Sequence, residues 1–408
     1  MPRVLIADSL SPAAIEIFRQ RGVDADVKTG LAKEDLIKII GDYDGLVVRS
    51  DTKPNKDVIA AAKNLKVIGR AGIGVDNIDI PAATAAGIVV MNTPFGNSIT
   101  TAEHAIAMMF ALARQMPAAD VSTQAGKWEK SRFMGVELYA KTLGLIGAGN
   151  IGSIVADRAL GLKMKVVAYD PFLSPERAVE IGVEKVELED LLARADVISL
   201  HTPLTKSGNA STWHLFDRQR LNQLKLGTWL INASRGPVVD NAALREVLLA
   251  REDLQAVLDV WEGEPEVDVD LADLCVLATP HIAGYSLEGR QRGTAQIYQA
   301  FCAYLGQAPS IQLSDLLPPL WLAEVHLNAE TDPAWALATL CRSVYDPRRD
   351  DADFRRSLVG TVQEQRTAFD LLRKHYPARR EIDGLSVRIN GESAVLTSIV
   401  SALGAKSL

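Results

Sequence analysis

A glycine fingerprint constrains the fold of this chain more than any other feature. The run Gly147-Ala-Gly149-Asn-Ile-Gly152 follows the apolar segment 142–146, and Asp170 ends the next apolar segment, 165–169. A strand, a glycine turn and a helix, followed about 20 residues later by an acid, are typical of dinucleotide-binding units. The glycine pattern alone also occurs by chance, so the flanking strand and the acid carry the prediction. We expect residues 98–284 to form a Rossmann-like domain with a doubly wound parallel sheet.

Each residue of the fingerprint has an expected task. Gly147 allows the tight turn, Gly149 lets the backbone approach a pyrophosphate, and Gly152 lets the helix pack on the strand. The phosphates would lie at the helix N-terminus, where free N–H groups favour anions. Asp170 would accept hydrogen bonds from the ribose hydroxyls and repel a 2′-phosphate, and the two residues after it bring no cation. The cofactor predicted is therefore NAD rather than NADP.

Three functional side chains follow later apolar runs, namely Arg235, Glu264 and His281. The carboxyl ends of parallel strands form the ligand crevice of such folds, so we expect the three to lie together. Glu264 would pair with His281 and fix its tautomer, which makes the imidazole a general base. Arg235 offers a two-pronged donor for a carboxylate. The set predicts oxidation of an alcohol beside a carboxylate. A surface ion pair is the alternative, but it does not explain why all three residues end strands.

Residues 1–97 predict a second parallel α/β domain. Short apolar runs at 4–7, 46–49, 67–70 and 88–91 alternate with helix signals, the first of which starts at Ser11. Two turns at strand ends are candidate anion sites. One is the pair Arg49 and Ser50, and the other is the run containing Arg70, Gly72 and Gly74, whose N–H groups would form an anion nest. A tight structural turn explains each of them equally well.

The pattern changes after Pro318. We expect a strand at 321–327, helices at 333–345 and from about 357 to 376, a strand at 385–389 and a last helix at 393–403. The charged run 346–356 is expected to be a solvated or interface face. Residues 318–408 therefore form a small α+β domain without a catalytic motif. Its aromatic side chains offer apolar area for a two-fold dimer, the commonest assembly; they are Trp321, Trp335, Tyr345 and Phe354.

Composition excludes several classes of function. The chain has 408 residues, a net charge of -7, 48% hydrophobic and 23% charged residues, so a nucleic-acid partner is not indicated. Three separated cysteines indicate neither disulfides nor a zinc site, and no other metal motif is seen. No apolar run is long enough for a signal peptide or a membrane span. We expect a cytoplasmic protein without a metal.

Together these segments resemble the D-isomer-specific 2-hydroxyacid dehydrogenase family over residues 1 to about 310. The runs 69–79, 92–97 and 101–104 are similar to members that act on 3-phosphoglycerate. The runs 259–265 and 281–289 and the whole tail are similar to members that act on 4-phospho-D-erythronate, and the change falls near 175–197. One departure from the latter is Arg70-Ala-Gly72, where those members have a threonine-rich turn.

The resemblance implies an architecture and a set of site residues. A discontinuous substrate domain (1–97 and 285–315) flanks the NAD domain (98–284), and 318–408 is the dimerisation domain. His281 is the proton acceptor, Glu264 its partner and Arg235 the carboxylate binder. Cofactor contacts are implied at Asn150, Ile151, Asp170, Ala233, Arg235, Asp259 and Gly284, and substrate contacts at Ser50 and Tyr285. Positions at strand ends and turns add Thr202 and Ser234 for the cofactor, and Arg49, Arg70, Gly72 and Gly74 for the substrate.

The predicted function is the NAD-dependent oxidation of a phosphorylated D-2-hydroxy acid. The favoured substrate is 4-phospho-D-erythronate, which would become 2-oxo-3-hydroxy-4-phosphobutanoate, and 3-phospho-D-glycerate is the alternative. A non-catalytic NAD-sensing protein on the same scaffold is the alternative of another class. A methyltransferase with this nucleotide fold would have no need of the His281–Glu264 pair.

Overall fold

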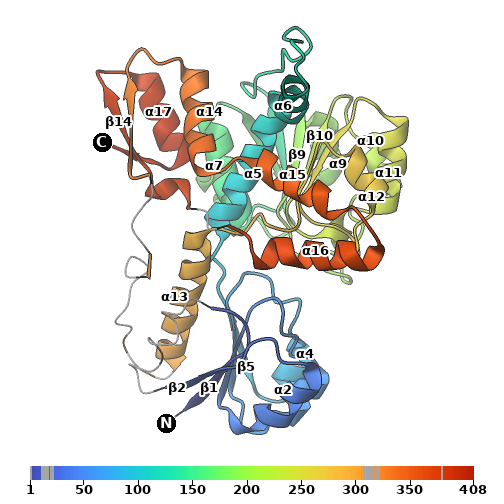
Figure 1. Ribbon diagram of the computed structural model, residues 1–408, viewed down its shortest axis with the longest axis vertical. Coiled ribbons are helices and arrows are strands. Elements are labelled where there is room, and N and C mark those ends of the chain that lie inside the picture. Colours follow the sequence, from blue (N-terminus) through green and yellow to red (C-terminus); the bar gives the residue numbers. More distant parts are fainter. Residues whose placement is uncertain are drawn as a thin grey trace. The chain divides into compact units, whose positions relative to one another are not determined.

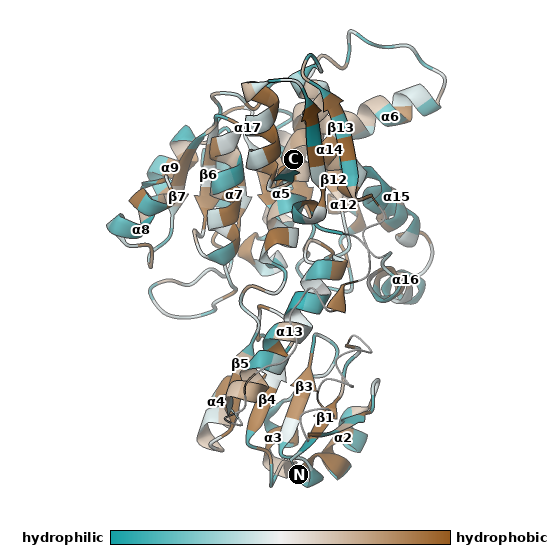
Figure 2. Ribbon diagram, turned by 90° about the vertical axis from the view of Figure 1, so that its left-hand side faces the viewer, coloured by the Kyte–Doolittle hydropathy of each residue, from teal (hydrophilic) through white to brown (hydrophobic). Residues whose placement is uncertain are grey.

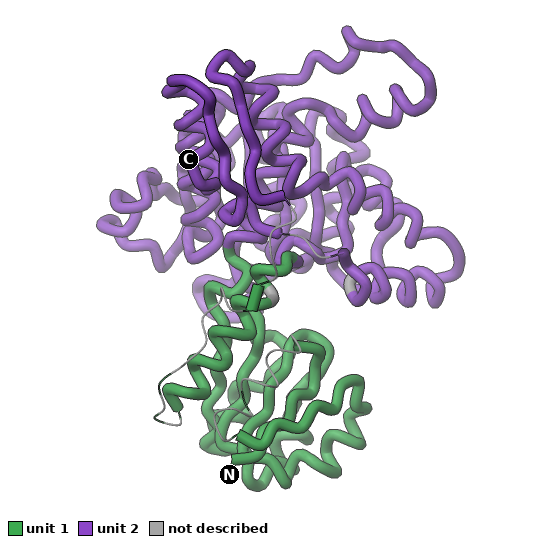
Figure 3. Tube along the Cα trace, turned by 60° about the vertical axis from the view of Figure 1, so that its left-hand side comes forward, with its two compact units in different colours: residues 1–98, 286–319 green, residues 99–285, 320–408 purple. Residues whose placement is uncertain are grey.

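The structure, a computed structural model, describes residues 2–10, 18, 23–304, 306, 308, 316–317, 322–377 and 380–408. The helix expected to start at Ser11 and the side chain of Trp321 lie outside these residues. The chain forms two compact units (Figure 3). The first contains residues 1–98 and 286–319, and the second contains 99–285 and 320–408. Each unit is built on a parallel sheet, so the predicted fold class is confirmed.

The first unit holds a five-stranded parallel sheet in the order β2-β1-β3-β4-β5 (Figure 1). Its elements are β1 (Arg3–Ile6), β2 (Asp24–Val27), α2 (Lys33–Ile39), β3 (Gly45–Val48), α3 (Lys56–Ala61), β4 (Val67–Arg70), α4 (Ile80–Ala85), β5 (Val89–Asn92) and α13 (Leu287–Tyr304). The central strand β3 is buried throughout, which explains its continuous apolar run (Figure 2). The edge strand β2 was not predicted, because its sequence Asp-Ala-Asp-Val lacks an apolar run.

Helix α13 follows residues 99–285 of the second unit in the sequence, but it belongs to the first unit. Its Phe301 ring lies against the sheet where β3 and β4 carry glycine. A Cβ atom at Gly45 or Gly69 would stand only 3.0 or 2.8 Å from the Phe301 ring. The glycines therefore make room for an aromatic ring, and a helix beginning at Leu287 completes a core that starts at β1.

The second unit holds a seven-stranded parallel sheet in the order β12-β11-β10-β9-β6-β7-β8. Its strands are β6 (Thr142–Ile146), β7 (Lys165–Tyr169), β8 (Glu184–Lys185), β9 (Val197–Leu200), β10 (Trp229–Asn232), β11 (Gln255–Leu258) and β12 (Leu277–Ala278). Its helices are α5 (Ser98–Ala113), α6 (Met116–Gln124), α7 (Asn150–Gly161), α8 (Pro175–Glu180), α9 (Leu188–Arg194), α10 (Arg218–Gln223), α11 (Asn241–Ala250) and α12 (Val269–Leu274). The strand order is that of dinucleotide-binding folds. The strands β6 and β7 lie where the apolar segments 142–146 and 165–169 predicted them, and β8 is a two-residue edge strand.

The two faces of this sheet are covered by different helices. Alternate residues of β6 and β7 pack against α5, α7 and α8 on one face and against α9 to α12 on the other. None of the helices in the described part of the chain combines the length and the apolarity needed to cross a bilayer.

The C-terminal segment adds a small sheet with the order β13-β14-β15, in which all strands are parallel. Its elements are β13 (Glu324–Asn328), α14 (Pro333–Val344), α15 (Pro347–Ser357), α16 (Val362–Lys374), β14 (Ser386–Asn390), α17 (Ala394–Leu403) and β15 (Lys406–Ser407). The charged run forms the hydrophilic helix α15 (Figure 2). Helix α17 packs closely on α7, since a Cβ atom at Gly161 would lie 2.4 Å from that of Ala402.

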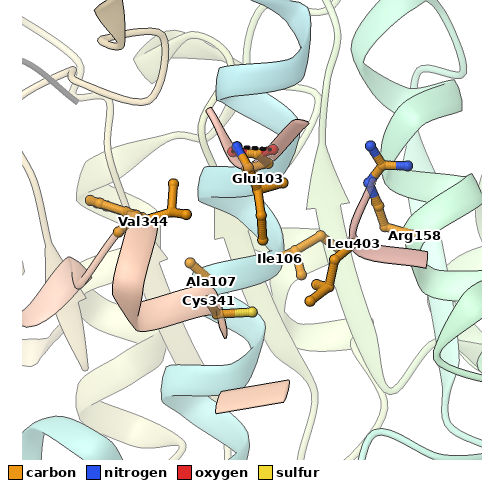
Figure 4. A pocket seen from close by; sticks show the side chains of 9 residues that line it. Glu103, Ile106, Ala107, Arg158, Cys341, Val344 and Leu403 are labelled. Atoms are coloured by element: carbon orange, nitrogen blue, oxygen red, sulfur yellow. Dashed lines mark hydrogen bonds between the residues drawn. The ribbon is translucent and has the colours of Figure 1, made fainter. Parts of the chain in front are cut away.

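The tail packs against the rest of the second unit, whereas residues 318–408 were predicted to form a domain of their own. Phe354 of α15 and Phe369 of α16 lie inside the core of the seven-stranded sheet. On the other side, Glu103 of α5 accepts a hydrogen bond from the backbone N–H of Ile382 beside a small apolar pocket (Figure 4). The tail therefore completes this unit. Two aromatic residues expected to face a partner, Tyr345 and Phe354, are buried within the chain.

Candidate active site

The glycine fingerprint forms an open turn at the N-terminus of α7. Gly147 has φ +92°, and a Cβ atom there would lie 2.6 Å from the carbonyl oxygen of His201. A Cβ atom at Gly152 would lie 2.1 Å from the carbonyl oxygen of Gly147. At Gly149, by contrast, a Cβ atom would meet nothing within 4 Å. Two glycines are thus required by close packing, and the third has open space beside it at the helix N-terminus, where a phosphate of NAD could approach the backbone.

Asp170 is held directly beside this turn. It follows β7, and its two carboxylate oxygens accept hydrogen bonds from the backbone N–H groups of Ala148 and Phe172, both at 2.9 Å. The side chain is half-buried. Because two backbone donors fix the carboxylate, it cannot turn away from a ligand in the fingerprint. The arrangement suits two ribose hydroxyls and opposes a phosphate in their place.

His281 and Glu264 form a hydrogen-bonded pair. The Nδ1 atom of His281 lies 2.7 Å from Glu264 Oε2, and the other carboxylate oxygen accepts the backbone N–H of Trp261 at 2.8 Å. The two side chains are 31% and 22% exposed, so they are reachable yet constrained. With Nδ1–H donating to Glu264, the neutral imidazole carries its lone pair on Nε2. The pair can therefore accept a proton and stabilise the resulting cation.

The backbone of His281 is held in a conformation that side chains rarely adopt. Its φ is +56°, and its N–H donates to the carbonyl oxygen of Asp259 at 2.6 Å. The Asp259 carboxylate accepts hydrogen bonds from the N–H groups of Ile282 (2.8 Å) and Ala283 (2.9 Å) and from the hydroxyl of Thr279 (2.6 Å). Such a conformation costs on the order of 1 kcal/mol or more and persists where the surroundings impose it, as they do here.

Asp259 itself is supported from helix α5. Burial alone would raise the pKa of its carboxyl, but nearby His104 and His281 and the hydrogen bonds of the turn bring that pKa below its ordinary value. His104 Nε2 lies 3.9 Å from Asp259, and Nδ1 shares a hydrogen bond of 3.0 Å with the Tyr345 hydroxyl. No catalytic or binding role was predicted for His104 from the sequence. The assignment of Asp259 as a cofactor contact stays a prediction, since its carboxylate is occupied by the turn.

Arg235 follows β10 on a turn fixed by a buried amide. Asn232 Oδ1 accepts from both the N–H and the hydroxyl of Ser234, and its Nδ2 donates to the carbonyl oxygen of Arg235. At Gly236 a Cβ atom would overlap the Trp261 carbonyl group, so only glycine fits. The guanidinium is half-buried and donates to the Ser234 carbonyl at 2.8 Å. Both Arg235 and Glu264 therefore depend on the backbone at Trp261.

The remaining candidates of the second unit also lie at carboxyl ends of its strands. Tyr285 closes the turn after His281, its N–H donating to the Ile282 carbonyl at 2.8 Å, and its side chain is half-buried. Thr202 and Gly284 are half-buried, and Ala233 is 8% exposed. Asn150 and Ile151 begin helix α7. The role of each as a ligand contact stays a prediction.

In the first unit, Arg49 and Ser50 follow β3. The backbone N–H of Arg49 donates to the buried carboxylate of Asp8 at 2.5 Å, and its guanidinium donates to the Ser9 carbonyl at 3.3 Å. The Ser50 hydroxyl donates to Asp51 at 3.2 Å. Both side chains are half-buried at a strand end, as a ligand contact requires.

The glycine turn after β4 differs from the expected anion nest. The N–H groups of Ala71 and Gly72 donate to the carbonyl oxygens of Val48 and Arg70, both at 2.9 Å, so the turn does not present them to an anion. The Arg70 guanidinium donates to Asn77 Oδ1 at 2.9 Å. Substrate contacts at Arg70, Gly72 and Gly74 stay predictions, although the Gly72 N–H is already engaged within the turn.

Comparisons with known proteins agree with this geometry. The family model of the D-isomer specific 2-hydroxyacid dehydrogenase NAD binding domain matches residues 106–283. Erythronate-4-phosphate dehydrogenase of Pseudomonas fluorescens (strain SBW25) is 64% identical over 365 residues, which are 90% of each chain. The chain belongs to the D-isomer specific 2-hydroxyacid dehydrogenase family. The resemblance stated from the sequence is thus confirmed.

Further comparisons give a second relative of the same name and a solved structure of the same fold. An erythronate-4-phosphate dehydrogenase from a second Pseudomonas fluorescens strain is 56% identical over 89% of each chain. Alignments of this length cross residues 175–197, so one relative covers both halves of the chain. Among solved structures, D-lactate dehydrogenase of Aquifex aeolicus with NAD and lactic acid has a TM-score of 0.66 at 25% identity, covering 74% of this chain and 95% of that one. The tail, residues 316–404, matches a domain of unknown function (DUF3410).

Two other groups in this dehydrogenase have a structural explanation. Burial raises the pKa of the Cys275 thiol to about 12, which makes it inert. His214, Asp240 and Glu262 bring one ligand atom each within 4.8 Å of one another. His214 Nε2 lies 2.7 Å from Glu262, so the group ties a loop to the segment that precedes Glu264.

His201 follows β9 and is buried beneath the fingerprint. Its Nε2 lies 2.8 Å from the Ser199 hydroxyl, and burial lowers the pKa of its imidazole to about 3. Its ring is therefore neutral in the folded protein near neutral pH. Of the two imidazoles at this end of the sheet, His281 is half-exposed and paired with Glu264, whereas His201 is buried.

A pH dependence of stability follows from His201. Between about pH 6.5 and pH 3 the unfolded chain binds a proton at this residue and the folded chain does not, so stability is lost as the pH falls. Between pH 7 and pH 5 the free energy of unfolding should fall by about 2 kcal/mol more in the wild type than in His201→Gln. Urea unfolding followed by tryptophan fluorescence measures this, because all six tryptophans belong to the second unit. Equal losses in the two proteins would contradict the prediction.

Proposed function

We propose that this chain oxidises 4-phospho-D-erythronate at C2 with NAD, which yields 2-oxo-3-hydroxy-4-phosphobutanoate. The observation that supports the reaction is the His281–Glu264 pair, in which Nδ1 lies 2.7 Å from Oε2. The pair follows the carboxyl ends of strands in the same sheet as the glycine turn and Asp170. The choice of acid is supported by relatives named for erythronate 4-phosphate at up to 64% identity over nine tenths of the chain.

The chain's own residues would move the proton and hold the acid. His281 Nε2 accepts the proton of the C2 hydroxyl while Glu264 stabilises the imidazolium through Nδ1–H. NAD, when bound, supplies the acceptor for the hydride that leaves C2. The Arg235 guanidinium binds the substrate carboxylate and stabilises the charge that develops on the new carbonyl oxygen. The C2–H and O–H bonds break, a carbonyl forms, and His281 later releases its proton to solvent.

The remaining substrate contacts are proposed from position. Tyr285, four residues after His281, would meet the 3-hydroxyl or the phosphate of the four-carbon acid. From the first unit, Arg49, Ser50 and the Arg70 turn would bind its anionic groups. The Arg70 turn is also the feature that favours the second candidate, 3-phospho-D-glycerate, because it resembles the turn of enzymes acting on that acid.

A side-by-side assay tests the assignment. With NAD, the wild type should turn over 4-phospho-D-erythronate with a higher kcat/KM than 3-phospho-D-glycerate. Tyr285→Phe should lower kcat/KM for the four-carbon acid by up to about ten-fold, the worth of one hydrogen bond, and leave the three-carbon acid nearly unaffected. A preference for 3-phospho-D-glycerate that ignores this substitution would replace the lead assignment by the second candidate. No turnover of any 2-hydroxy acid would favour an NAD-sensing protein.

We also propose a two-fold homodimer. Trp335 of α14 is 55% exposed in the tail, and Trp128 and Met134 are 86% and 77% exposed elsewhere in the same unit. Large exposed apolar side chains are typical of interaction surfaces. Light scattering of the full chain should give twice the mass of 44.2 kDa, and a single-chain mass would refute the proposal.

A further inference from the structure

The Tyr285 side chain is held by the tail. Its backbone is fixed by the turn that follows His281, but the direction of its ring depends on what the ring touches. The ring of Tyr376 meets it edge to face, with centroids 5.5 Å apart and planes at 85°. This is a favourable geometry for two aromatic rings. A residue more than ninety positions later therefore sets where the Tyr285 hydroxyl lies.

Tyr376 is in turn fixed by a buried carboxylate. Its hydroxyl donates to Asp350 Oδ2 at 2.6 Å, and Asp350 is only 3% exposed. The other oxygen of Asp350 accepts hydrogen bonds from the Arg349 guanidinium at 3.1 and 3.3 Å. That guanidinium also lies 5.9 Å from the centre of the Tyr376 ring. Charge-assisted bonds of this kind hold a side chain more firmly than neutral ones.

Helix α15, which carries Asp350, is anchored to the strand that leads to His281. Asp351 accepts the backbone N–H of Ala278 in β12 at 2.8 Å. The Arg355 guanidinium donates to the Cys275 carbonyl at 3.0 Å. Asp350 is therefore in a fixed place relative to the catalytic turn, and the contacts run without a gap from α15 through Tyr376 to Tyr285.

We propose that Tyr376 and Asp350 are positioning residues that hold the Tyr285 hydroxyl where a phosphorylated four-carbon acid needs it. The inference rests on the proposed function, in which Tyr285 contacts the substrate. It gives the tail a part in substrate choice, although the tail supplies no group that touches the reacting atoms.

Tyr376 is a suitable residue for substitution because it does not fill a core. It is half-buried and lines a pocket of about 460 Å³ together with Pro280, Ile282 and Asp350. Removing the ring enlarges an existing hollow rather than opening a new cavity, so the fold should survive. Tyr376→Phe keeps the ring and loses the bond to Asp350, and Tyr376→Leu loses the ring contact as well.

A double-mutant cycle tests the proposal. Tyr376→Leu should lower kcat/KM for 4-phospho-D-erythronate by about five- to ten-fold, in the range of one aromatic contact, and Tyr376→Phe by less. In the Tyr285→Phe background the same Tyr376→Leu change should cost less than about two-fold, because the group through which it acts is gone. The Kd for NAD should stay at the wild-type value, and the melting temperature should fall by only a few degrees, because Asp350 loses one of its partners. Val359→Ala, at an apolar side chain of the same tail that is 77% exposed, is the control and should leave kcat/KM within about two-fold.

Several outcomes overturn the proposal. Independent, multiplying effects of the two substitutions would show that Tyr376 does not act through Tyr285. Absence of any effect of Tyr285→Phe or of Tyr376→Leu would do the same. A wrong substrate assignment is distinguishable, because the wild type would then prefer another acid. The cycle is run on 4-phospho-D-erythronate in either case, because a less preferred substrate still reports whether the two tyrosines are coupled.

Discussion

Replacing His281 with alanine is expected to lower kcat by about 10²–10⁴-fold while the Kd for NAD stays unchanged. The imidazole is the group placed to take the hydroxyl proton, since its Nδ1 is committed to Glu264 at 2.7 Å. The glycine turn and Asp170, which would hold the cofactor, contain no contact with His281 among their hydrogen bonds. Steady-state rates and a fluorescence titration with NAD measure the two quantities.

Two further variants sharpen this result. Glu264→Gln keeps the shape of the pair but removes the charge that stabilises imidazolium, so it should lower kcat by less than His281→Ala does. His326→Ala is the matched control, because His326 is 59% exposed on β13 and pairs with Glu324. A His281→Ala enzyme that retains more than a tenth of the wild-type kcat would remove the imidazole from its proposed role.

The second large effect concerns the cofactor. The wild type is expected to show a kcat/KM with NAD at least about 100-fold above that with NADP, because a 2′-phosphate beside a fixed, partly buried carboxylate costs several kcal/mol. Asp170 accepts two backbone N–H groups and cannot swing aside to relieve the repulsion. Parallel rate measurements with the two cofactors give the ratio.

Asp170→Ala should reduce that ratio by at least about ten-fold, mainly through a poorer reaction with NAD. Asp157→Ala is the matched control, because that side chain is 69% exposed on α7, and its ratio should equal the wild-type value. A wild type that uses both cofactors equally well would mean that Asp170 does not face the ribose.

The sequence predicted those elements that carry continuous apolar runs. β6 and β7 lie at their predicted bounds, because strands buried on both faces need such runs. The strands β2, β8 and β15 were missed, since they are short, lie at sheet edges and contain Asp, Glu or Lys. The charged run 346–356 was not expected to enter a core. It does so because Phe354 packs into the core, while Asp351 and Arg355 bind backbone groups of the neighbouring strand and helix.

The candidate site likewise contains residues that were predicted from the sequence and supporting contacts that were not. The His281–Glu264 pair was predicted because both residues end apolar runs, and parallel strands bring such ends together. The support around the pair was not, because each of its contacts joins distant parts of the chain. His104 and Tyr345 are 241 residues apart, and Asp351 and Ala278 are 73 apart. No local periodicity records such contacts, so they can be found only in the folded chain.

The packing of Phe301 against Gly45 and Gly69 has a consequence for the order in which the protein is made. The first five strands leave the ribosome early, yet one face of their sheet is incompletely covered until a helix almost 200 residues further along has been synthesised. During that interval the nascent chain exposes apolar strands of the kind that associate wrongly. The intervening segment, 99–285, has meanwhile emerged in full, whereas its own core still awaits Phe354 and Phe369. Each unit therefore completes its core only after a later segment of the chain has been synthesised. For this reason the chain should depend on chaperones more than a dehydrogenase built from contiguous domains.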